Sequence, residues 1–456
     1  MATYQDLNPL VNKKISLLVP SIYKVGIGLI LLFVICTSCV SAKFDETYIS
    51  NSIQELSNYN TAREGNSTEL QIPNSVNLND GLSQEESITL ALYNNAQFQA
   101  DLIDLSLANA DLVSAGQLPN PLLSIIFPTG SDPLKGTLNF AIDALWQRPF
   151  RVKTAHLESE RTALNIVNKG LLLIRDTKIA YANSLLANEQ MLFGDENIQL
   201  RSRLAQIITK QYEAGEISQM EASLAVSDST LARQDAIRAL NKAQVARSQL
   251  IAITGLDSVS KDLGLSGSTY SPRIIAPLNA LLDTAYTKRT DLKAAQIAIE
   301  IKGKQLGWEK SKIISLMGIL SARRESGEIF VGPGFSVGLP IFNWNKGNIL
   351  RKNAEIKQAA WQYIVVKRNV TLEVNQAYNE YKTAVENYEL WQSNALAMDR
   401  VPEQARKAFE AGEVSYFFYL ETLRRFSDFK LRSVDAEAAM LIGEAKLNYA
   451  VGTKQL

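Results

Sequence analysis

A nine-residue segment occurs twice in this chain, and the repetition constrains the fold more than any other feature. KQYEAGEIS at residues 210–218 returns as KAFEAGEVS at 407–415, 197 positions later. The same offset separates Gly255 of AITGL from Gly452 of YAVGT. Two pairs of landmarks at one offset indicate that a whole helix was duplicated together with its ends. Chance recurrence of a loop would not keep this register.

The two halves predict the same order of elements: a helix, two strands, a very long helix, a turn and another long helix. The first repeat covers residues 83–255 and the second covers 279–453, with a non-helical connector at 256–278. Residues 39–82 are rich in Asn and Ser and show no sustained period. We expect them to form an irregular lead-in.

The first helix of each repeat is expected to be continuous. Ser83 and Glu86 have the spacing of a capping box, so the helix begins there and runs to about Gly116, where the sequence PNP stops it. The counterpart in the second repeat covers about 279–311.

The longest helices carry heptad patterns. Between residues 150 and 211, leucines recur every seven positions in a row that only Lys178 interrupts. The row comprises Leu157, Leu164, Leu171, Leu185 and Leu192, and the second copy repeats the spacing with Val370, Ala377, Ala384, Trp391 and Met398. Sustained heptads predict helices packed side by side as a supercoil, each about 90 Å long at 1.5 Å per residue. Pro402 is expected to kink or interrupt the second of them.

Four strands are expected, at about 121–128, 136–146, 313–323 and 331–342. The sequence TLNFAID alternates apolar and polar residues, as does GFSVGLPIF. One apolar face suits a sheet between hydrocarbon and water, although a soluble sheet packed on helices explains the alternation equally well. Four strands cannot close a barrel, so the chain either oligomerises or stays out of the membrane. With the long helices, the predicted class is an α+β membrane protein.

The first 38 residues resemble a signal peptide of the lipoprotein type. Lysines precede the apolar run VGIGLILLFVI, which is too short for a typical membrane-spanning helix. Cleavage before Cys39 would leave that cysteine as a lipid anchor. A plain cleaved signal and an uncleaved membrane anchor are the alternatives. Cys36 and Cys39 also form a CxxC pair, but they lie inside the export segment rather than at a helix start, which argues against redox chemistry.

Composition excludes several classes of function. Lys plus Arg and Asp plus Glu are equal at 47 each, so there is no basic surface for nucleic acid. His156 is the single histidine, which excludes a His-based metal site within one chain and argues against a Ser-His or Cys-His catalytic pair. A carboxylate pair among the 47 acidic residues stays open, but no spacing singles one out. We expect neither an enzyme nor a cofactor.

The chain resembles the TolC-type outer-membrane efflux proteins, and among them the CzcC-like channels of cation and drug efflux pumps. The resemblance covers about residues 83–453 and is carried by AGQLPNPLLSI, GPGFSVGLPIFNWNKG and the paired YEAGEIS and FEAGEVS turns. It implies a homotrimer in the outer membrane, in which each subunit lends four strands to one twelve-stranded barrel. The helices would continue that barrel as a hollow coiled-coil α-barrel across the periplasm.

The resemblance also implies partners. These are a periplasmic adaptor and an inner-membrane efflux transporter, which would pass heavy-metal cations or drugs to a passive duct. A type I secretion exit channel for polypeptides is an alternative. A structural coiled-coil lipoprotein that transports nothing is another, although such a spacer has no use for alternating strands.

By the same resemblance, the turns dock the adaptor. The matching residues are Gly215, Glu216, Ser218, Gly412, Glu413 and Ser415. Turn chemistry alone also explains the glycines and serines, because Gly permits a left-handed turn and Ser caps the next helix.

The family's pore constriction uses acids six and nine residues after the turn glycine. Here those positions hold Glu221 and Leu224 in the first copy, and Phe418 and Glu421 in the second. A ring of Glu421 would attract cations, while rings of Phe418 would close the path by dewetting. Packing between helices is the alternative for the aromatic run YFFYL at 416–420.

Overall fold

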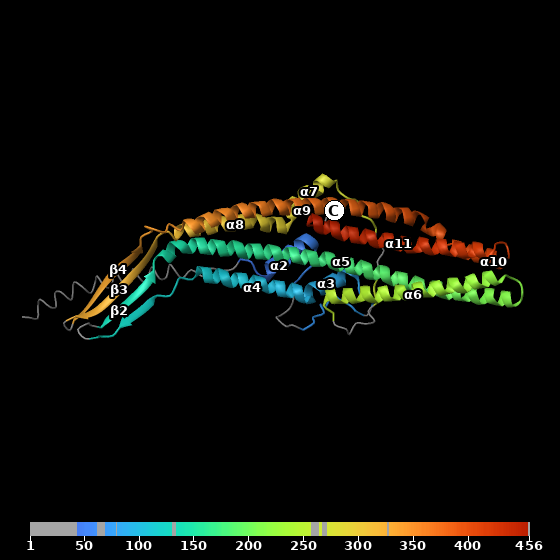
Figure 1. Ribbon diagram of the computed structural model, residues 1–456, viewed down its shortest axis with the longest axis horizontal. Helices are drawn as coiled ribbons and strands as arrows, with labels where there is room; N and C mark the ends of the chain where they lie inside the picture. Colours follow the sequence, from blue (N-terminus) through green and yellow to red (C-terminus); the bar gives the residue numbers. More distant parts are fainter. Residues whose placement is uncertain are drawn as a thin grey trace, which may run out of the picture. The chain divides into compact units, whose positions relative to one another are not determined.

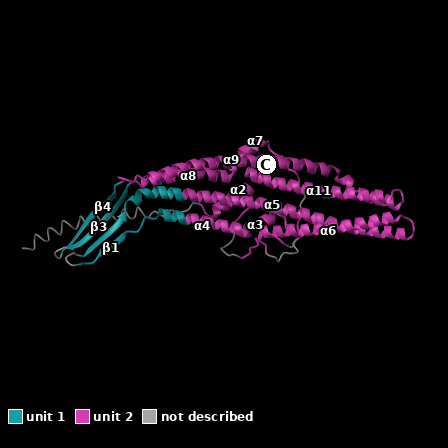
Figure 2. Ribbon diagram, viewed as in Figure 1, with its two compact units in different colours: residues 1–43, 110–155, 314–339 teal, residues 44–109, 156–313, 340–456 magenta. Residues whose placement is uncertain are grey.

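The computed structural model describes residues 43–61, 69–78, 80–129, 134–256, 264–266, 271–325 and 328–454. The predicted signal peptide and Cys39 lie outside these ranges. The chain divides into two compact units, coloured separately in Figure 2. One includes residues 110–155 and 314–339, and the other includes 44–109, 156–313 and 340–456.

The first unit contains a four-stranded antiparallel sheet of order β1-β2-β3-β4 (Figure 1). The strands are β1 (Leu122–Ile126), β2 (Lys135–Ala141), β3 (Ser315–Glu325) and β4 (Glu328–Gly338). These bounds confirm the α+β class. The second predicted strand is too long, because Asp143 already begins a helix. Asp143 therefore does not alternate with the strand residues as the sequence pattern suggested.

The register places apolar residues of all four strands on one face. Leu138 lies opposite both Leu123 and Leu320, and Leu320 lies opposite Pro333. This face comprises Leu123, Ile125, Leu138, Phe140, Leu316, Leu320, Val331, Phe335 and Val337. The opposite face is mixed: it includes Thr137, Asn139, Ser321, Gly334 and Ser336, together with the apolar residues Leu122, Ile126, Met317, Ile319 and Phe330. Since neighbouring side chains in a strand point to opposite faces, the predicted alternation becomes a two-sided sheet.

The apolar face is open. Leu123 is 67% exposed and Phe335 is 73% exposed. At its centre, the ring of Phe140 covers Gly318, where an added Cβ would lie 2.3 Å from Phe140 Cε2. Among the described residues, β1 and β4 each pair with one neighbour only, so the sheet has two free edges. Both features leave apolar surface and backbone groups without partners.

The second unit is helical, and α4 and α5 extend into both units (Figures 1 and 2). In the first half of the chain the helices are α2 (Glu46–Ser57), α3 (Gln84–Asn94), α4 (Ala96–Gly116), α5 (Asp143–Glu213) and α6 (Gln219–Thr254). In the second half they are α7 (Leu278–Lys288), α8 (Thr290–Ser311), α9 (Lys346–Met398), α10 (Val401–Glu410) and α11 (Tyr416–Val451). Within the described ranges, no helix is both long enough and apolar enough to cross a membrane.

Helix α2 corrects the prediction of an irregular lead-in. Asp45 caps it by accepting a hydrogen bond from Tyr48 N at 2.9 Å. Ile49 and Ile53 are fully buried in a core that α3, α4 and α5 complete. The helix is therefore stabilised by packing against distant residues, which a search for long periodic segments does not detect.

The first helix of each repeat is broken, contrary to prediction. The capping box at Ser83 and Glu86 is present, but α3 ends before Asn95, and α7 ends before Arg289. Asn95 Nδ2 donates to the carbonyl of Ile253 (3.1 Å), and Arg289 Nη1 donates to that of Ala450 (3.3 Å).

Those two carbonyls lie 197 positions apart, the same offset as the repeated turns. Each break thus allows a side chain to reach the last turn of α6 or α11, where carbonyls lack partners within the helix.

The heptad rows form much of the helical core. Leu157, Leu164, Val370, Ala377 and Ala384 are buried, whereas Leu192 is exposed. Pro402 interrupts the second long helix as predicted, since α9 ends at Met398 and Pro402 lies in the first turn of α10.

Candidate functional site at the helical tips

The two repeated segments form the same turn. We call residues 210–221 the first tip and 407–418 the second tip. In the first tip, Glu216 N donates to the carbonyl of Gln211 (2.9 Å) and Gly215 N to that of Tyr212 (2.9 Å). In the second tip, Glu413 N and Gly412 N donate to the carbonyls of Ala408 (2.9 Å) and Phe409 (3.0 Å). This pair of bonds defines a Schellman motif.

The turn glycines have left-handed backbones. The φ angle is +79° at Gly215 and +75° at Gly412. An added Cβ would meet nothing within 4 Å at either position. Glycine is therefore required by the backbone angle and not by a lack of space.

The helices after the turns are capped differently. Ser218 Oγ accepts from Glu221 N (3.3 Å), and Glu221 Oε2 accepts in return from Ser218 N (3.0 Å), which completes a capping box. Ser415 Oγ accepts a hydrogen bond from Phe418 N (3.3 Å), but Phe418 has no carboxylate that could accept one from Ser415 N in return. Glu221, predicted to line a constriction, thus caps its own helix.

Two apolar clusters lie between the tips. Ala205 and Ile208 of α5 pack with Ala222 and Ala225 of α6 and with Tyr416 of α11. A second cluster comprises Leu204, Ala405, Tyr419 and Leu423. Phe409 of α10 borders both, and its ring stacks on that of Tyr419 with 5.2 Å between centroids. The two hairpins therefore share one packed region near their ends.

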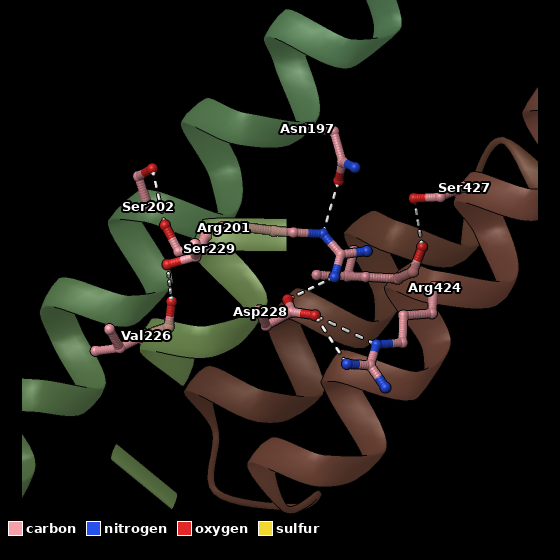
Figure 3. Close-up of polar contacts among 10 residues, drawn as sticks. Asn197, Arg201, Ser202, Val226, Asp228, Ser229, Arg424 and Ser427 are labelled. Atoms are coloured by element: carbon pink, nitrogen blue, oxygen red, sulfur yellow. Dashed lines mark hydrogen bonds and ion pairs between the residues drawn. The ribbon is translucent and has the colours of Figure 1, made fainter. Parts of the chain in front are cut away.

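A buried ion cluster joins the same helices (Figure 3). Asp228 on α6 is 4% exposed, and it forms an ion pair with Arg201 of α5, whose side chain is 7% exposed. Its other oxygen, Oδ1, accepts from Arg424 Nη2 of α11 at 2.9 Å. Asn197 Oδ1 accepts from Arg201 Nε at 2.9 Å. One carboxylate thus bridges the first hairpin to the second, in surroundings where an unpaired charge is costly.

The local charges affect nearby titrating groups. Burial raises the pKa of Tyr416 to about 12, and the negative charge of Asp228 adds to the rise. On the surface of α10, hydrogen bonds from Arg406 lower the pKa of Glu403 to about 2. Arg406 also pairs with Glu410 at 2.7 Å, which forms a charged strip on this short helix.

The remaining predicted site residues lie at the surface. Glu216 and Glu413 are exposed at the turns. Phe418 is 58% exposed, and Glu421 forms an ion pair with Arg425 (2.9 Å). In the aromatic run, Tyr416, Tyr419 and Leu420 are buried, whereas Phe417 and Phe418 are not. Packing therefore accounts for part of that run and leaves Phe418 available at the tip.

Sequence reasoning missed the Asp228 cluster, although a signal existed. Asp228 lies on the stripe of small residues that α6 buries, namely Ala222, Ala225, Ala232 and Ala236. A charged residue on a buried stripe predicts a buried partner. The identity of that partner depends on α5 and α11 and is not visible in α6.

The described residues contain no group of three or more His, Cys, Asp and Glu side chains that could hold a metal ion. His156 packs its ring against that of Phe44, with 5.5 Å between centroids.

Comparison with known proteins finds one family model and one curated relative that resemble this chain. Residues 315–453 match the family model described as Outer membrane efflux protein. The cobalt-zinc-cadmium resistance protein CzcC of Cupriavidus metallidurans is 21% identical over 358 residues, which cover 77% of this chain and 85% of that protein. This chain is therefore similar to outer-membrane efflux proteins, and the match to the family model lies in its second repeat.

Solved structures of channel proteins share the fold. The CmeC outer membrane channel of Campylobacter jejuni superposes with a TM-score of 0.70 at 16% identity, covering 86% of this chain and 92% of CmeC. CusC gives a TM-score of 0.66 at 18% identity, with 82% and 93% covered. VceC of Vibrio cholerae gives 0.65 at 16% identity, with 81% and 96% covered. The outer-membrane efflux resemblance predicted from sequence is thereby confirmed.

Proposed function

We propose that this efflux protein is one of three identical subunits of an outer-membrane exit duct. The observation that carries the proposal is the open sheet, whose apolar face is exposed and whose edge strands β1 and β4 each lack a second neighbour among the described residues. In lipid, backbone groups at an open edge cost several kcal/mol each, so a four-stranded sheet needs other strands to close it. Three copies supply twelve strands, within the range of known membrane barrels.

The second face of the sheet fits a water-filled interior. It carries the polar residues Thr137, Asn139, Ser321 and Ser336, with glycines between them on β4, alongside Leu122, Ile126, Met317, Ile319 and Phe330. Outward apolar and inward polar residues are the arrangement of membrane barrels with aqueous channels. A structural spacer needs neither face, which favours the duct over a coiled-coil lipoprotein that transports nothing.

The tips are proposed to dock a periplasmic adaptor, through which an inner-membrane transporter delivers the cargo. Glu216 and Glu413 are exposed beside the turn glycines, so both turns present a carboxylate and a short backbone loop. Gly215 and Gly412 shape the loops, and Ser218 and Ser415 begin the following helices. A partner helix with basic residues matches this surface.

The narrowest part of the proposed duct is expected to be formed by side chains at and just after the second tip. The carboxylate of Glu221 accepts two hydrogen bonds from Ser218, which leaves Phe418 and Glu421 as the exposed members of the predicted set. Three exposed phenyl rings close to one axis would hinder hydrated ions by dewetting. Arg425 pairs with Glu421 and weakens any negative ring there.

Metal cations are the proposed cargo. The relative CzcC is named for cobalt, zinc and cadmium resistance, and it is matched over 85% of its length. The duct itself is passive, so its cargo is set by the pump and the adaptor. Loss of the gene is expected to lower resistance to these metals more than to drugs. Equal sensitivity to drugs, or loss of a secreted polypeptide, would assign the duct to another system.

Conductance in planar bilayers tests the duct. The purified protein is expected to run as a heat-sensitive trimer and to form ion channels. Two neighbouring residues of β4 provide a matched pair of variants, because Phe335 lies on the apolar face and Ser336 on the other. Phe335→Asp places a charge in lipid and is expected to prevent insertion, whereas Ser336→Asp is expected to insert and to favour cations.

Equal behaviour of the two variants would contradict the assignment of the faces. A soluble monomer without detergent and without conductance would overturn the duct and favour the spacer.

Acylation of Cys39 is proposed separately, and Cys39→Ser is expected to abolish labelling by a fatty-acid analogue while the channels remain. Unchanged labelling would place the lipid elsewhere.

A further inference from the structure

A small cavity lies where α2, α5 and α11 meet within the helical unit. Its volume is about 30 Å³. The lining includes Ser57 at the end of α2, Arg175 and Lys178 of α5, Asn448 of α11, and Lys454 beyond α11. A water molecule needs about 10–15 Å³ by this measure, so the space suits one or two waters or a single monatomic ion. It is too small for an organic phosphate.

Lys178 is the residue that interrupts the leucine row, and the cavity accounts for its position. Burial lowers the pKa of its ammonium group, and the positive charges of Lys454 and Arg273 act in the same direction. Glu444 and Glu85 oppose the shift from a distance. Glu444 is already paired with Arg273 at 3.3 Å. Within the described ranges Lys178 forms no ion pair, so a partly buried cation lacks a direct counter-charge.

A second lysine, Lys454, lines the same cavity and contacts the same aromatic ring. Lys178 Nζ lies 5.9 Å and Lys454 Nζ 5.6 Å from the centre of the Tyr59 ring. The backbone holds Lys454 there, because its N–H donates to the carbonyl of Leu56 at 3.1 Å. Arg175 adds a third cation, although Asp176 accepts two hydrogen bonds from it, at 2.8 and 2.6 Å. The cavity is therefore lined by more positive than negative charge.

Asn448 supplies an independent observation. Its Nδ2 and Oδ1 are both buried, and neither has a hydrogen-bond partner among the described residues. Leaving a buried amide without hydrogen bonds is costly, so such groups in native proteins normally contact a water or an ion. The amide nitrogen can donate to an anion, while the oxygen can accept from a lysine ammonium group.

We propose that this cavity binds a small monovalent anion of the halide class, held by the ammonium groups of Lys178 and Lys454 and by Asn448 Nδ2. Water alone would satisfy Asn448 but would leave the two lysines repelling each other. A bound anion both offsets the repulsion between the two lysines and accepts a hydrogen bond from Asn448 Nδ2. The bound ion fastens α2 and the end of α11 to α5, and chloride is the halide available to an exported protein.

Thermal unfolding of the purified full chain in detergent tests the proposal. Sodium chloride or bromide is titrated against sodium gluconate at constant ionic strength. We expect the midpoint to rise by about 2 °C and to saturate, because binding to the native state stabilises it by mass action. Lys178→Met and Asn448→Leu keep the approximate volume of the side chains and are expected to abolish the rise. In gluconate, Lys178→Met should unfold no earlier than the original protein.

Lys446→Met is the matched control, because Lys446 lies on the same helix as Asn448 but pairs with Glu380 at the surface. It should retain the halide response. Crystals soaked in bromide should show one anomalous peak between the two lysines. Identical midpoints in chloride and gluconate, or a halide response that survives both cavity variants, would overturn the proposal. A merely structural role for Lys178 would lower the midpoint equally in both salts. Channel conductance does not depend on this result.

Discussion

The first and second tips share a turn but differ in the helices that flank it. Both turns use a left-handed glycine and a serine cap. Before the first turn α5 is continuous, whereas before the second turn the helix is interrupted between Met398 and Val401. After the turns, Glu221 completes a capping box, while Phe418 at the matching position is exposed. The first hairpin is therefore held more firmly by its own residues.

The comparison shows which features a duplication keeps. The backbone chemistry of a turn depends on a few adjacent residues, so both copies retain it. Side chains that face the other hairpin need not match, and Asp228 of the first hairpin contacts Arg424 of the second without a mirrored pair at the equivalent positions, Arg425 and Ser227. The second hairpin thus depends on the first for one of its anchors. Each experiment below alters one side of this comparison.

The largest effect is expected for Asp228→Asn. The substitution leaves the buried Arg201 without a counter-charge and frees Arg424, so the free energy of unfolding should fall by about 3–5 kcal/mol. Urea unfolding in detergent measures the loss. Asp235→Asn on the same helix is the control, because Asp235 and Arg238 are both exposed and their pair contributes little. If both variants lowered the free energy of unfolding equally, the Asp228 cluster would not be what holds the two hairpins together.

Alkaline pH should weaken the second tip, where the pKa of Tyr416 is raised. The pKa of Tyr416 is raised from 10.0 to about 12, so the native state holds a proton that the unfolded chain releases. The resulting stability, about 3 kcal/mol, is fully present below pH 10 and is lost as pH rises through 12. Tyr416→Phe should make this slope shallower and leave the part that comes from the other buried tyrosines. The first tip has Gln219 at the matching position, so Gln219→Ala should leave the slope unchanged.

The turn glycines should respond alike. Gly215→Ala and Gly412→Ala each force a left-handed backbone on an L residue, and each should lower the free energy of unfolding by about 1 kcal/mol. Gly255→Ala should cost more, because its Cβ would lie 2.4 Å from the Asn94 carbonyl oxygen. Thermal midpoints rank the three. A clear difference between the first two would show that the turns are not equivalent.

The smallest effect is expected from exchanging the capping residues. Phe418→Glu gives Ser415 the partner that Ser218 has in Glu221, and should stabilise the second tip by about 0.5 kcal/mol. Glu221→Phe should destabilise the first tip, because Ser218 would lose its capping partner. If Phe418 forms the constriction, Phe418→Glu should also raise single-channel conductance, whereas Phe417→Glu, next to it in the sequence, should not.

Much of this fold follows from residues close together in the sequence. The repeated turns, the capping box at Ser83 and the interruption at Pro402 were predictable because each depends on one or two local backbone requirements. The face of the sheet was predictable because strand side chains alternate strictly. The docking and constriction roles of the tip residues remain predictions.

The tertiary structure alone decided the features that depend on distant partners. Asn95 and Arg289 break helices that their local sequence would continue, because each side chain bonds a carbonyl at the end of another helix. Helix α2, the pairing of Asp228 and the cavity beside Lys178 arise in the same way. The sequence by itself determined the repeat, the turns and the two-faced strands, since these need only neighbouring residues. Contacts between residues far apart depend on how helices pack, and no local pattern records that arrangement.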